Sequence, residues 1–335
     1  MKKNKLLVTG VAGYIGSTFT YEALKKGYEV VGFDNFCNSD DAIVNNFLRN
    51  HADQFKFIEL DLQNKAELNS VLRQHKNIDC VLHFAALKSA PESEDKFDLY
   101  WKNNVEGTKS LLEAIEINGI KNIIFSSSAA VYGEQEIQPI NEEAQTKPIS
   151  NYGLTKLESE NHIKDYASNG IIKAISLRYF NPVASHEDYV IHEDYTKSNN
   201  LMSIILRAAK KKIDVLKIYG NDYPTKDGTA ERDFIHISDL IDGHFFALDR
   251  IGTLENYIDI NLGTGASISV LEMVKTFKKA NNIEFEVDFA ARREGDISTN
   301  YAKVDKARDV LGWQSSHNLE KMCRDAWEAI QNDYK

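Results

Sequence analysis

Short apolar runs alternate with segments of helical length over the first half of the chain. Strand-like runs occur at 5–9, 29–34, 57–62, 79–86, 122–127 and 174–180. Residues 17–27 have a helical pattern that ends at Gly27, a residue type common just past a helix. Strands separated by helical segments are typical of a doubly wound parallel sheet. The pattern therefore predicts an α/β fold built on such a sheet.

The pattern changes beyond Asn181. A helical segment at 200–211 is followed by a short strand at 216–220, a loop at 220–230 rich in Gly, Pro and Asp, and short mixed elements. Because cores of more than about 250–300 residues tend to split, we expect two domains, 1–182 and a smaller α/β domain at 183–335. The strand-like run at 257–262 could return to the first sheet, which would make the division discontinuous.

Composition and charge narrow the choice of partners. Hydrophobic residues make up 42% of the 335 residues, charged residues make up 27%, and the formal net charge is -10. The chain therefore has enough apolar surface for true cores, but its charge does not favour nucleic acid or an anionic membrane. An anionic ligand would need its own local cations. Composition and charge therefore argue against nucleic acid and against a membrane as partners.

The three cysteines, Cys37, Cys80 and Cys323, are widely spaced and form no CxxC pair. This spacing favours a reducing compartment and offers neither a disulfide framework nor a zinc site, so we expect a cytoplasmic protein without a metal. The apolar residues near the N-terminus are interrupted by Thr9 and glycines, which argues against a secretion signal or a membrane span.

A glycine-rich segment separates the first predicted strand from the first helix. Its residues are Gly10, Gly13, Tyr14, Ile15 and Gly16 in the spacing GxxGxxG. Glycines there permit a tight turn, close approach of the backbone to a pyrophosphate, and close helix packing. The second strand ends at Asp34, whose carboxylate suits the adenine ribose hydroxyls and repels a 2'-phosphate. The segment predicts a Rossmann site for NAD; the alternative is a simple turn followed by a helix-capping or solvated Asp34.

A tyrosine and a lysine four positions apart suggest catalysis. Tyr152 and Lys156 follow the strand that ends in the serines at 126–128, whereas Tyr21 and Lys25 repeat the spacing within the first helix. Ligands bind at the carboxyl ends of strands in open parallel sheets, which favours the first pair. A cation about 6 Å from the phenol contributes roughly 3 kcal/mol, or about two pKa units, at an effective dielectric of about 20.

Ser128 offers a hydroxyl that could bind the reacting oxygen and relay its proton. A serine at a strand end often only satisfies backbone groups, so spacing alone leaves function and structure equally open for each of the three serines. Together with Tyr152 and Lys156, the triplet predicts a hydride-transfer site.

The sequence resembles the UDP-glucose 4-epimerase family of extended short-chain dehydrogenases over nearly its whole length. The matching motifs are TGVAGYIG (9–16), DNFCNS (34–39), HFAALK (83–88), NNVEGT (103–108), FSSSAAVYG (125–133), YGLTK (152–156), LRYFNP (177–182), NNL (199–201), GNDYPTKDGT (220–229), RDFIH (232–236) and ARREGD (291–296).

The resemblance implies a shell for tightly bound NAD and a second shell for the uridine diphosphate. The NAD shell would comprise Asp34, Asn35, Phe36, Cys37, Asn38, Ser39, Asp61, Leu62, Phe84, Ala85, Ala86, Lys88, Asn103, Ser126, Tyr152, Lys156 and Phe180. The substrate shell would comprise Ser128, Asn181, Asn200, Leu201, Tyr219, Arg232, Arg293, Asp296 and Asn300. Arg232 and Arg293 would supply the local cations, since a guanidinium fork suits phosphate oxygens.

The resemblance also implies a mechanism and an assembly. Tyr152, helped by Ser128, would remove the C4 hydroxyl proton while the C4 hydride moves to the nicotinamide. The resulting 4-keto sugar would rotate about its diphosphate and take the hydride back on its other face, with no net redox change. Helices around 98–118 and 152–168 match the pair that forms a dimer interface in the family, so we expect a homodimer.

Three alternatives bear on this reading. Related dehydratases carry an Asp-Glu pair where this chain has Ala129 and Ala130, so elimination of water would lack its acid and base; other epimerases have threonine where Ala130 stands. A non-catalytic NAD-binding regulatory protein would be expected to lack Ser128, Tyr152 or Lys156. Asn300, or Tyr301 beside it, aligns where family members set substrate size, which leaves N-acetylated UDP-hexoses open beside UDP-glucose and UDP-galactose.

Overall fold

The computed structural model describes residues 4–188, 191–293 and 295–331. The chain packs into two compact units. Unit 1 runs to Gly133 and continues over 145–178 and 244–260, and unit 2 comprises 134–144, 179–243 and the chain from 261 onward. The main boundary between the units thus falls after Arg178, whereas the sequence pattern had suggested 182. In addition, residues 134–144 belong to unit 2 and residues 244–260 belong to unit 1.

Unit 1 is organised around a seven-stranded sheet. Its strands, in spatial order, are β11 (Tyr257–Leu262), β6 (Lys173–Tyr179), β5 (Asn122–Ser128), β4 (Cys80–His83), β1 (Lys5–Thr9), β2 (Glu29–Asp34) and β3 (Phe55–Glu59). The pairings from β5 through β4, β1 and β2 to β3 are all parallel. Backbone bonds from Ala174 to Asn256 and from Phe180 to Leu262 advance in the same direction, so β6 and β11 are parallel as well. The sheet confirms the predicted α/β class.

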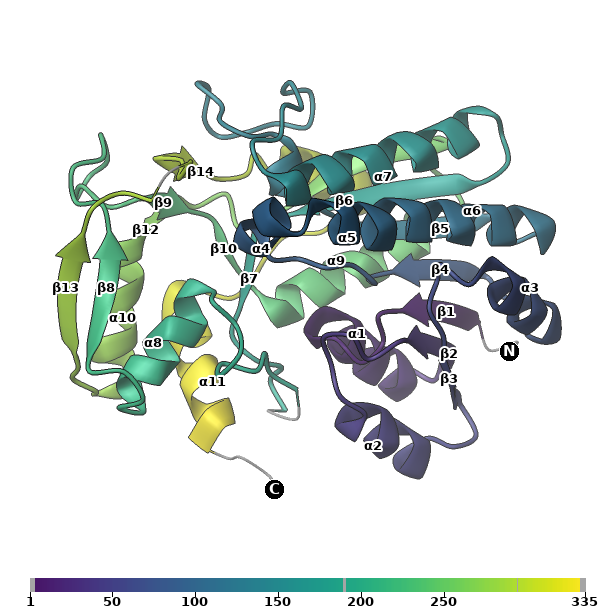
Figure 1. Ribbon diagram of the computed structural model, residues 1–335, viewed down its shortest axis with the longest axis horizontal. Coiled ribbons are helices and arrows are strands. Elements are labelled where there is room, and N and C mark those ends of the chain that lie inside the picture. Colours follow the sequence, from purple (N-terminus) through teal and green to yellow (C-terminus); the bar gives the residue numbers. More distant parts are fainter. Residues whose placement is uncertain (1–3, 189–190, 294, 332–335) are drawn as a thin grey trace. The chain divides into compact units, whose positions relative to one another are not determined.

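Helices cover both faces of this sheet. They are α1 (Tyr14–Lys25), α2 (Ala42–Asn50), α3 (Lys65–Gln74), α4 (Ala90–Asp95), α5 (Phe97–Tyr100), the π-helical η1 (Trp101–Glu106), α6 (Gly107–Ile117), the short η2 (Ala129–Val131), α7 (Asn151–Ser168), and α9 (Ile237–Arg250) from residue 244. Figure 1 shows α3, α6 and α7 on one side of the sheet and α1 and α2 on the other. Apolar residues of α3, α6 and α7 form one continuous core with those of the strands.

Two strands of the sheet end three residues earlier than their apolar runs suggested. The run 57–62 is a strand only to Glu59, and the run 79–86 only to His83. Beyond Glu59 the Asp61 carboxylate accepts the backbone N–H of Gln63, which turns the chain out of the sheet. The apolar residues past both strand ends therefore lie in loops at the carboxyl edge of the sheet, where ligands bind in folds of this class.

Unit 2 contains three small sheets. They are β7 (Asn181–Val183) with β10 (Phe234–His236); β12 (Ile268–Ser269), β9 (Glu231–Arg232) and β14 (Thr299–Asn300); and β8 (Val215–Tyr219) with β13 (Glu286–Ala290). Its helices include α8 (Leu201–Ala209), α10 (Val270–Asn281), the π-helical η3 (Ala307–Leu311) and α11 (Leu319–Gln331). Side chains from α8, α10, α11 and β8 share one apolar core. Among the described residues, every helix is too short or too polar to cross a bilayer.

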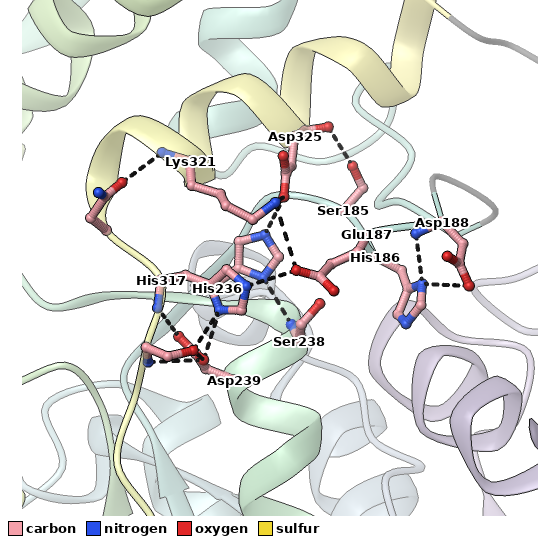
Figure 2. A network of polar contacts seen from close by, with 12 residues as sticks. Ser185, His186, Glu187, Asp188, His236, Ser238, Asp239, His317, Lys321 and Asp325 are labelled. Carbon is pink, nitrogen blue, oxygen red and sulfur yellow. Dashed lines mark hydrogen bonds and ion pairs between the residues drawn. The ribbon is translucent and has the colours of Figure 1, made fainter. Parts of the chain in front are cut away.

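A buried polar network joins the loops of unit 2 (Figure 2). The rings of His236 and His317 stack with centroids 4.3 Å apart. His236 Nε2 lies 3.0 Å from Asp325, while the two ring nitrogens of His317 lie 2.7 Å from Asp239 and 2.9 Å from Glu187. Each of these nitrogens thus meets a carboxylate, and the contacts tie β10, α9, α11 and two loops together.

Candidate active site

Two of the three motif glycines are required by the fold itself. Gly10 has a φ of +72°, and a Cβ there would lie 2.7 Å from the backbone nitrogen of Ala85. A Cβ on Gly16 would lie 2.1 Å from the carbonyl oxygen of Gly10. Gly13 differs, because its nearest neighbour would be 3.5 Å away, which is ordinary contact. Packing within the protein does not demand a glycine at 13, which leaves the space beside it for something outside the chain.

The first turn of α1, like that of α2, lacks the side-chain caps that begin three other helices of unit 1. Side chains of Asn64, Ser89 and Ser150 accept backbone N–H groups at the starts of α3, α4 and α7. At α1 the N-cap is Gly13, with no side-chain cap and no acidic residue in the first turn. Helical N–H groups without partners carry partial positive charge, so this helix start suits an anionic group such as a phosphate.

A groove lies at the carboxyl edge of the sheet, with an empty volume of about 580 Å³ that includes space open to solvent. Residues from the ends of β1, β2, β3 and β4 line it, together with η1. They are Gly10, Gly13, Asp34, Asn35, Cys37, Ser39, Asp61, Leu62, Phe84, Ala85, Ala86 and Asn103. Each of them belongs to the set that sequence motifs had suggested for NAD.

The other residues of that set lie outside the lining. Tyr14, Ile15 and Gly16 form the first turn of α1. Phe36 and Asn38 belong to the loop after β2, and Lys88 to the loop after β4. Ser126, Tyr152 and Lys156 lie on β5 and α7, while Phe180 belongs to unit 2. The groove therefore accounts for twelve residues of the predicted set.

The carboxylate of Asp34 organises the groove's loops. Asp34 Oδ2 accepts the N–H of Ala12 at 2.9 Å, and its Oδ1 accepts the N–H of Phe36 at 2.9 Å and the hydroxyl of Ser39 at 3.1 Å. Asp34 thereby links the glycine turn to the loop after β2. Its position at the strand end also leaves it on the groove wall, where it can accept ribose hydroxyls.

Ser128, Tyr152 and Lys156 come together at the end of β5 and the start of α7. A hydrogen bond joins the hydroxyls of Ser128 and Tyr152. Lys156 is only 3% exposed; its Nζ donates to the carbonyl oxygen of Ser126 at 2.7 Å and lies 6.0 Å from the centre of the Tyr152 ring. The Ser150 cap and a bond from the Tyr152 N–H to Ser93 Oγ at 2.9 Å fix the helix start that carries them.

The structure distinguishes the three serines that spacing could not. Ser126 contributes its backbone carbonyl to Lys156. The Ser127 hydroxyl is buried and, among the described residues, has no hydrogen-bond partner. Ser128 Oγ accepts the N–H of Ala130 at 3.2 Å and also reaches Tyr152. Only Ser128 has a hydroxyl that acts directly on the phenol.

Burial favours the neutral forms of Tyr152 and Lys156, whereas proton transfer uses the phenolate and the ammonium. Burial raises the pKa of Tyr152 to about 12, and the hydrogen bond from Ser128 opposes that rise. Burial lowers the pKa of Lys156 to about 7, against the attraction of Glu160. Perturbed groups beside a groove are a common mark of a functional site. The site therefore favours a ligand that restores positive charge near the phenol.

A π-helical segment connects the groove to the catalytic helix, and the sequence gave no sign of it. In η1, Asn103 lines the groove, and its side-chain amide donates to Asn104 Oδ1 at 3.0 Å. Asn104 is buried, binds both backbone groups of Leu87, and donates to Thr155 on α7 at 3.0 Å. π-helical turns often occur at functional sites, because the extra residue re-aims side chains. In the sequence, only the adjacent asparagines Asn103 and Asn104 could have pointed to this segment.

Apart from Ser128, the predicted substrate residues lie in unit 2, with contacts of their own. Arg232 on β9 is largely buried and pairs with Asp296, and Asn300 on β14 is its register partner. The guanidinium of Arg293 lies 3.9 Å from the centre of the Tyr219 ring. Each of the two arginines thus already contacts another predicted substrate residue: Arg232 contacts Asp296, and Arg293 contacts Tyr219.

The remaining predicted substrate residues contact other neighbours. The Asn181 side chain donates to the carbonyl oxygen of Asp233 at 2.9 Å. Asn200 precedes α8 and donates to Glu193 at 2.9 Å, and Leu201 is the first residue of that helix. The structure therefore brings part of the predicted set together and places the rest on separate elements of unit 2.

The fold and the groove define a dinucleotide-binding protein of the doubly wound α/β class. Residues 6–263 match the family described as the NAD dependent epimerase/dehydratase family. The chain is 43% identical to a UDP-glucose 4-epimerase of Bacillus subtilis over 96% of this chain and 95% of that protein. The chain belongs to the NAD dependent epimerase/dehydratase family, which confirms the resemblance seen in its motifs.

Solved structures agree. A UDP-glucose-4-epimerase from Stenotrophomonas maltophila with bound NAD and formylated UDP-arabinopyranose superposes with a TM-score of 0.94, at 38% identity and 98% coverage of both chains. A UDP-glucose 4-epimerase from Bifidobacterium longum in complex with NAD+ and UDP gives a TM-score of 0.92, at 36% identity, covering 98% of this chain and 99% of that one.

Proposed function

We propose that the chain is an NAD-dependent UDP-hexose 4-epimerase that interconverts UDP-glucose and UDP-galactose through a 4-keto sugar. The observation that carries this proposal is the cluster of Ser128, Tyr152 and Lys156. The Asn103–Asn104 link ties this cluster to the groove at the glycine turn. Family membership and relatives of that activity support the same reaction.

The residues present fit NAD. The room beside Gly13 and the uncapped start of α1 suit a pyrophosphate, and the Asp34 carboxylate on the groove wall suits a ribose with free hydroxyls. The twelve lining residues, with Lys156, Tyr152 and Ser126, would hold the cofactor. When bound, NAD supplies a hydride acceptor and donor, which the protein's own side chains cannot provide.

Each catalytic side chain has a distinct task. Tyr152 takes the proton of the C4 hydroxyl and later returns it, and the Ser128 hydroxyl binds that oxygen and the phenol together. Lys156 supplies the positive charge that favours the phenolate, because its ammonium lies 6.0 Å from the ring. Anchoring the diphosphate at Arg232 and Arg293 would leave the sugar free to turn over between the two proton transfers.

The side chains beside Ser128 favour epimerisation over dehydration. Ala129 and Ala130 follow it in η2 and carry no carboxyl group that could act as acid or base at C5 and C6. A non-catalytic NAD-binding role would not need a buried lysine held against Ser126 or a phenol bonded to Ser128. Elimination and pure sensing are therefore the weaker proposals.

The width of substrate choice rests on Asn300 and Tyr301. Asn300 lies in β14 in register with Arg232, and the Tyr301 N–H donates to Gln138 Oε1 at 3.2 Å, which fixes this strand within unit 2. Asparagine is smaller than tyrosine, so a wall formed by Asn300 would leave room for an N-acetyl group. UDP-N-acetylglucosamine and UDP-N-acetylgalactosamine are therefore proposed as additional substrates.

The proposal also includes a homodimer and a cytoplasmic location. Phe97 and Leu99 on α5, Ile117 on α6 and Leu154 on α7 are exposed, which is unusual for large apolar side chains on neighbouring helices. A second copy of the chain would cover them in a homodimer. Free thiols at Cys37, Cys80 and Cys323 are compatible with the cytoplasm as the compartment.

One experiment tests activity and breadth together. The purified protein is incubated separately with UDP-galactose and UDP-N-acetylgalactosamine without added NAD, and the products are resolved by chromatography. Formation of UDP-glucose supports the epimerase, and formation of UDP-N-acetylglucosamine supports the wider substrate range. If the protein retains NAD but converts neither sugar, the epimerase proposal is wrong.

A further inference from the structure

A buried ion cluster lies beside the catalytic helix, and the reaction as described makes no use of it. Arg178 on β6 donates through Nε and Nη2 to the two oxygens of Glu160, at 3.0 and 2.7 Å. Its Nη1 lies 2.7 Å from Asp259 on β11 and donates to the Tyr132 hydroxyl at 3.0 Å. Glu160 and Arg178 are almost fully buried. A two-pronged guanidinium–carboxylate pair of this kind is held firmly in one geometry.

Glu160 stands one helical turn beyond Lys156 on α7, so the two side chains occupy the same face. Both are buried, with exposed fractions of 3% each. The cluster joined by Arg178 contains two carboxylates and one guanidinium. The cluster thus carries one more negative than positive charge, and the nearby charge of Glu160 favours a protonated Lys156. A buried charge without such compensation is costly.

Among the described residues, one further cation lies near this cluster: Lys164 on α7 is exposed, and its Nζ lies 5.7 Å from the ring centre of Tyr257. His83 on β4 has a pKa lowered by burial to about 3 and is therefore neutral. Tyr132 and Tyr257 are phenols, and burial, followed by the charge of Glu160, raises the pKa of Tyr257. On α7 itself Tyr152 is the reacting phenol, and on β5 the neighbours of Lys156 are the Phe125 ring and the Ser126 carbonyl.

We propose that Glu160 and Asp259, joined by Arg178, are positioning residues that keep Lys156 protonated and thereby allow Tyr152 to act as a base. This inference rests on the proposed function, because it assigns a source for the charge that the reaction requires. It also gives a task to the arginine of LRYFNP and the tyrosine of VYG, which sequence motifs had highlighted without a role. Tyr132 contributes by holding Arg178, whose guanidinium lies 4.9 Å from its ring centre.

The test uses the purified protein with its bound cofactor and three substitutions. Glu160→Gln and Asp259→Asn each remove one negative charge with little change in shape, and Asp259→Asn leaves the Arg178–Glu160 pair in place. Glu158→Gln on the same helix is the matched control, because Glu158 pairs with His162 at 3.3 Å and lies outside the cluster. Tyr152 ionisation is followed by phenolate absorbance against pH, as the difference between each protein and its Tyr152→Phe counterpart.

We expect the Tyr152 ionisation midpoint to rise by about one pH unit in Glu160→Gln and by a smaller amount in Asp259→Asn. The kcat at neutral pH should fall by about tenfold in Glu160→Gln, with KM unchanged, and the acid limb of the kcat profile should move to higher pH. Glu158→Gln should match the wild-type protein in all three measurements. Melting temperatures of every variant are recorded, and Asp259→Asn decides the matter if Glu160→Gln does not fold.

A purely structural role would lower the melting temperature and the activity without moving the ionisation midpoint, and that result would overturn the inference. An unchanged midpoint in a folded Asp259→Asn protein overturns it as well. Absence of epimerisation in the wild-type protein would instead reject the proposed function. The two failures are distinguishable, because the absorbance titration requires no turnover.

Discussion

Unit 1 contains the same tyrosine–lysine spacing twice, once on α1 and once on α7. Tyr21 and Lys25 lie on α1, with the lysine Nζ 5.1 Å from the ring centre. Tyr152 and Lys156 lie on α7, with the corresponding distance at 6.0 Å. Helix geometry has thus produced nearly the same arrangement in both places. The difference lies in what surrounds each pair.

The Lys25 side chain is 44% exposed and forms an ion pair with Glu22 at 3.0 Å. Lys156 is buried, reaches only a backbone carbonyl at 2.7 Å, and has a pKa lowered by burial to about 7. An exposed ion pair contributes little to energy or chemistry, whereas a buried lysine titrates near neutrality and changes the charge seen by its neighbour. The comparison teaches that the motif gains chemical meaning from desolvation and from its place at the strand ends.

The largest expected effect comes from removing each phenol. Tyr152→Phe should lower kcat by on the order of 10³- to 10⁴-fold, because it removes the proton acceptor, while Tyr21→Phe should leave kcat within about a factor of two. Steady-state assays with UDP-galactose measure both. Equal losses in the two variants would contradict the assignment of the catalytic tyrosine.

The two lysines give the next contrast. Lys156→Met removes a charge about 6 Å from the phenol, worth roughly 3 kcal/mol at an effective dielectric of about 20, so kcat should fall roughly 100-fold. Lys25→Met loses only an exposed ion pair and should change the free energy of unfolding by less than about 1 kcal/mol, with kcat unaffected. Kinetic assays and melting curves of both variants provide the check. A Lys156→Met protein with normal kcat would remove the electrostatic role.

Ser128 and Ser127, both on β5, also differ in their surroundings, and the expected difference in kcat is smaller. Ser128→Ala deletes the hydroxyl that binds Tyr152, and one such hydrogen bond, at about 1.5 kcal/mol, corresponds to roughly tenfold in kcat. Ser127→Ala removes a buried hydroxyl that lacks a partner among the described residues, so kcat should stay unchanged and stability should not fall. A larger kinetic loss at Ser127 than at Ser128 would reverse their roles.

The smallest expected effect tests whether burial or hydrogen-bond partners set the direction of the pKa shift of His317. In unit 2 burial lowers the pKa of His317, yet the hydrogen bonds that its ring donates to Glu187 and Asp239, with the charges of these carboxylates, outweigh burial and raise that pKa (Figure 2). A raised folded-state pKa stabilises the protein below the unfolded value of about 6.5, and that stability is lost as pH rises through the folded value.

His317→Gln should therefore reduce the free energy of unfolding more at pH 6 than at pH 9, by on the order of 1 kcal/mol, and the melting temperature should fall accordingly. Thermal melts across this pH range measure it, and His51→Gln, outside the network, is the control. A constant difference between wild type and His317→Gln at all pH values would show that this histidine is not charged.

Sequence alone determined the class of fold and most of the groove. Alternating apolar runs require parallel strands with helices between them, and the clashes that a Cβ would make at Gly10 and Gly16 show why glycines were needed there. Asp34 was predictable because the apolar run of its strand ends at that residue, and the strand ends there too. These features depend on local periodicity or on backbone freedom, and both are readable from adjacent residues.

Only the tertiary structure decided how deeply each of the two tyrosine–lysine pairs is buried and which neighbours each of the three serines contacts. It also revealed the π-helical turn at Asn103 and Asn104, and the cluster of Glu160, Arg178 and Asp259. Partners far apart in the chain create these features, and no single segment encodes the burial that they share. Desolvation and charge balance are properties of the packed molecule, which is why the same four-residue spacing is exposed and ion-paired on α1 but buried on α7.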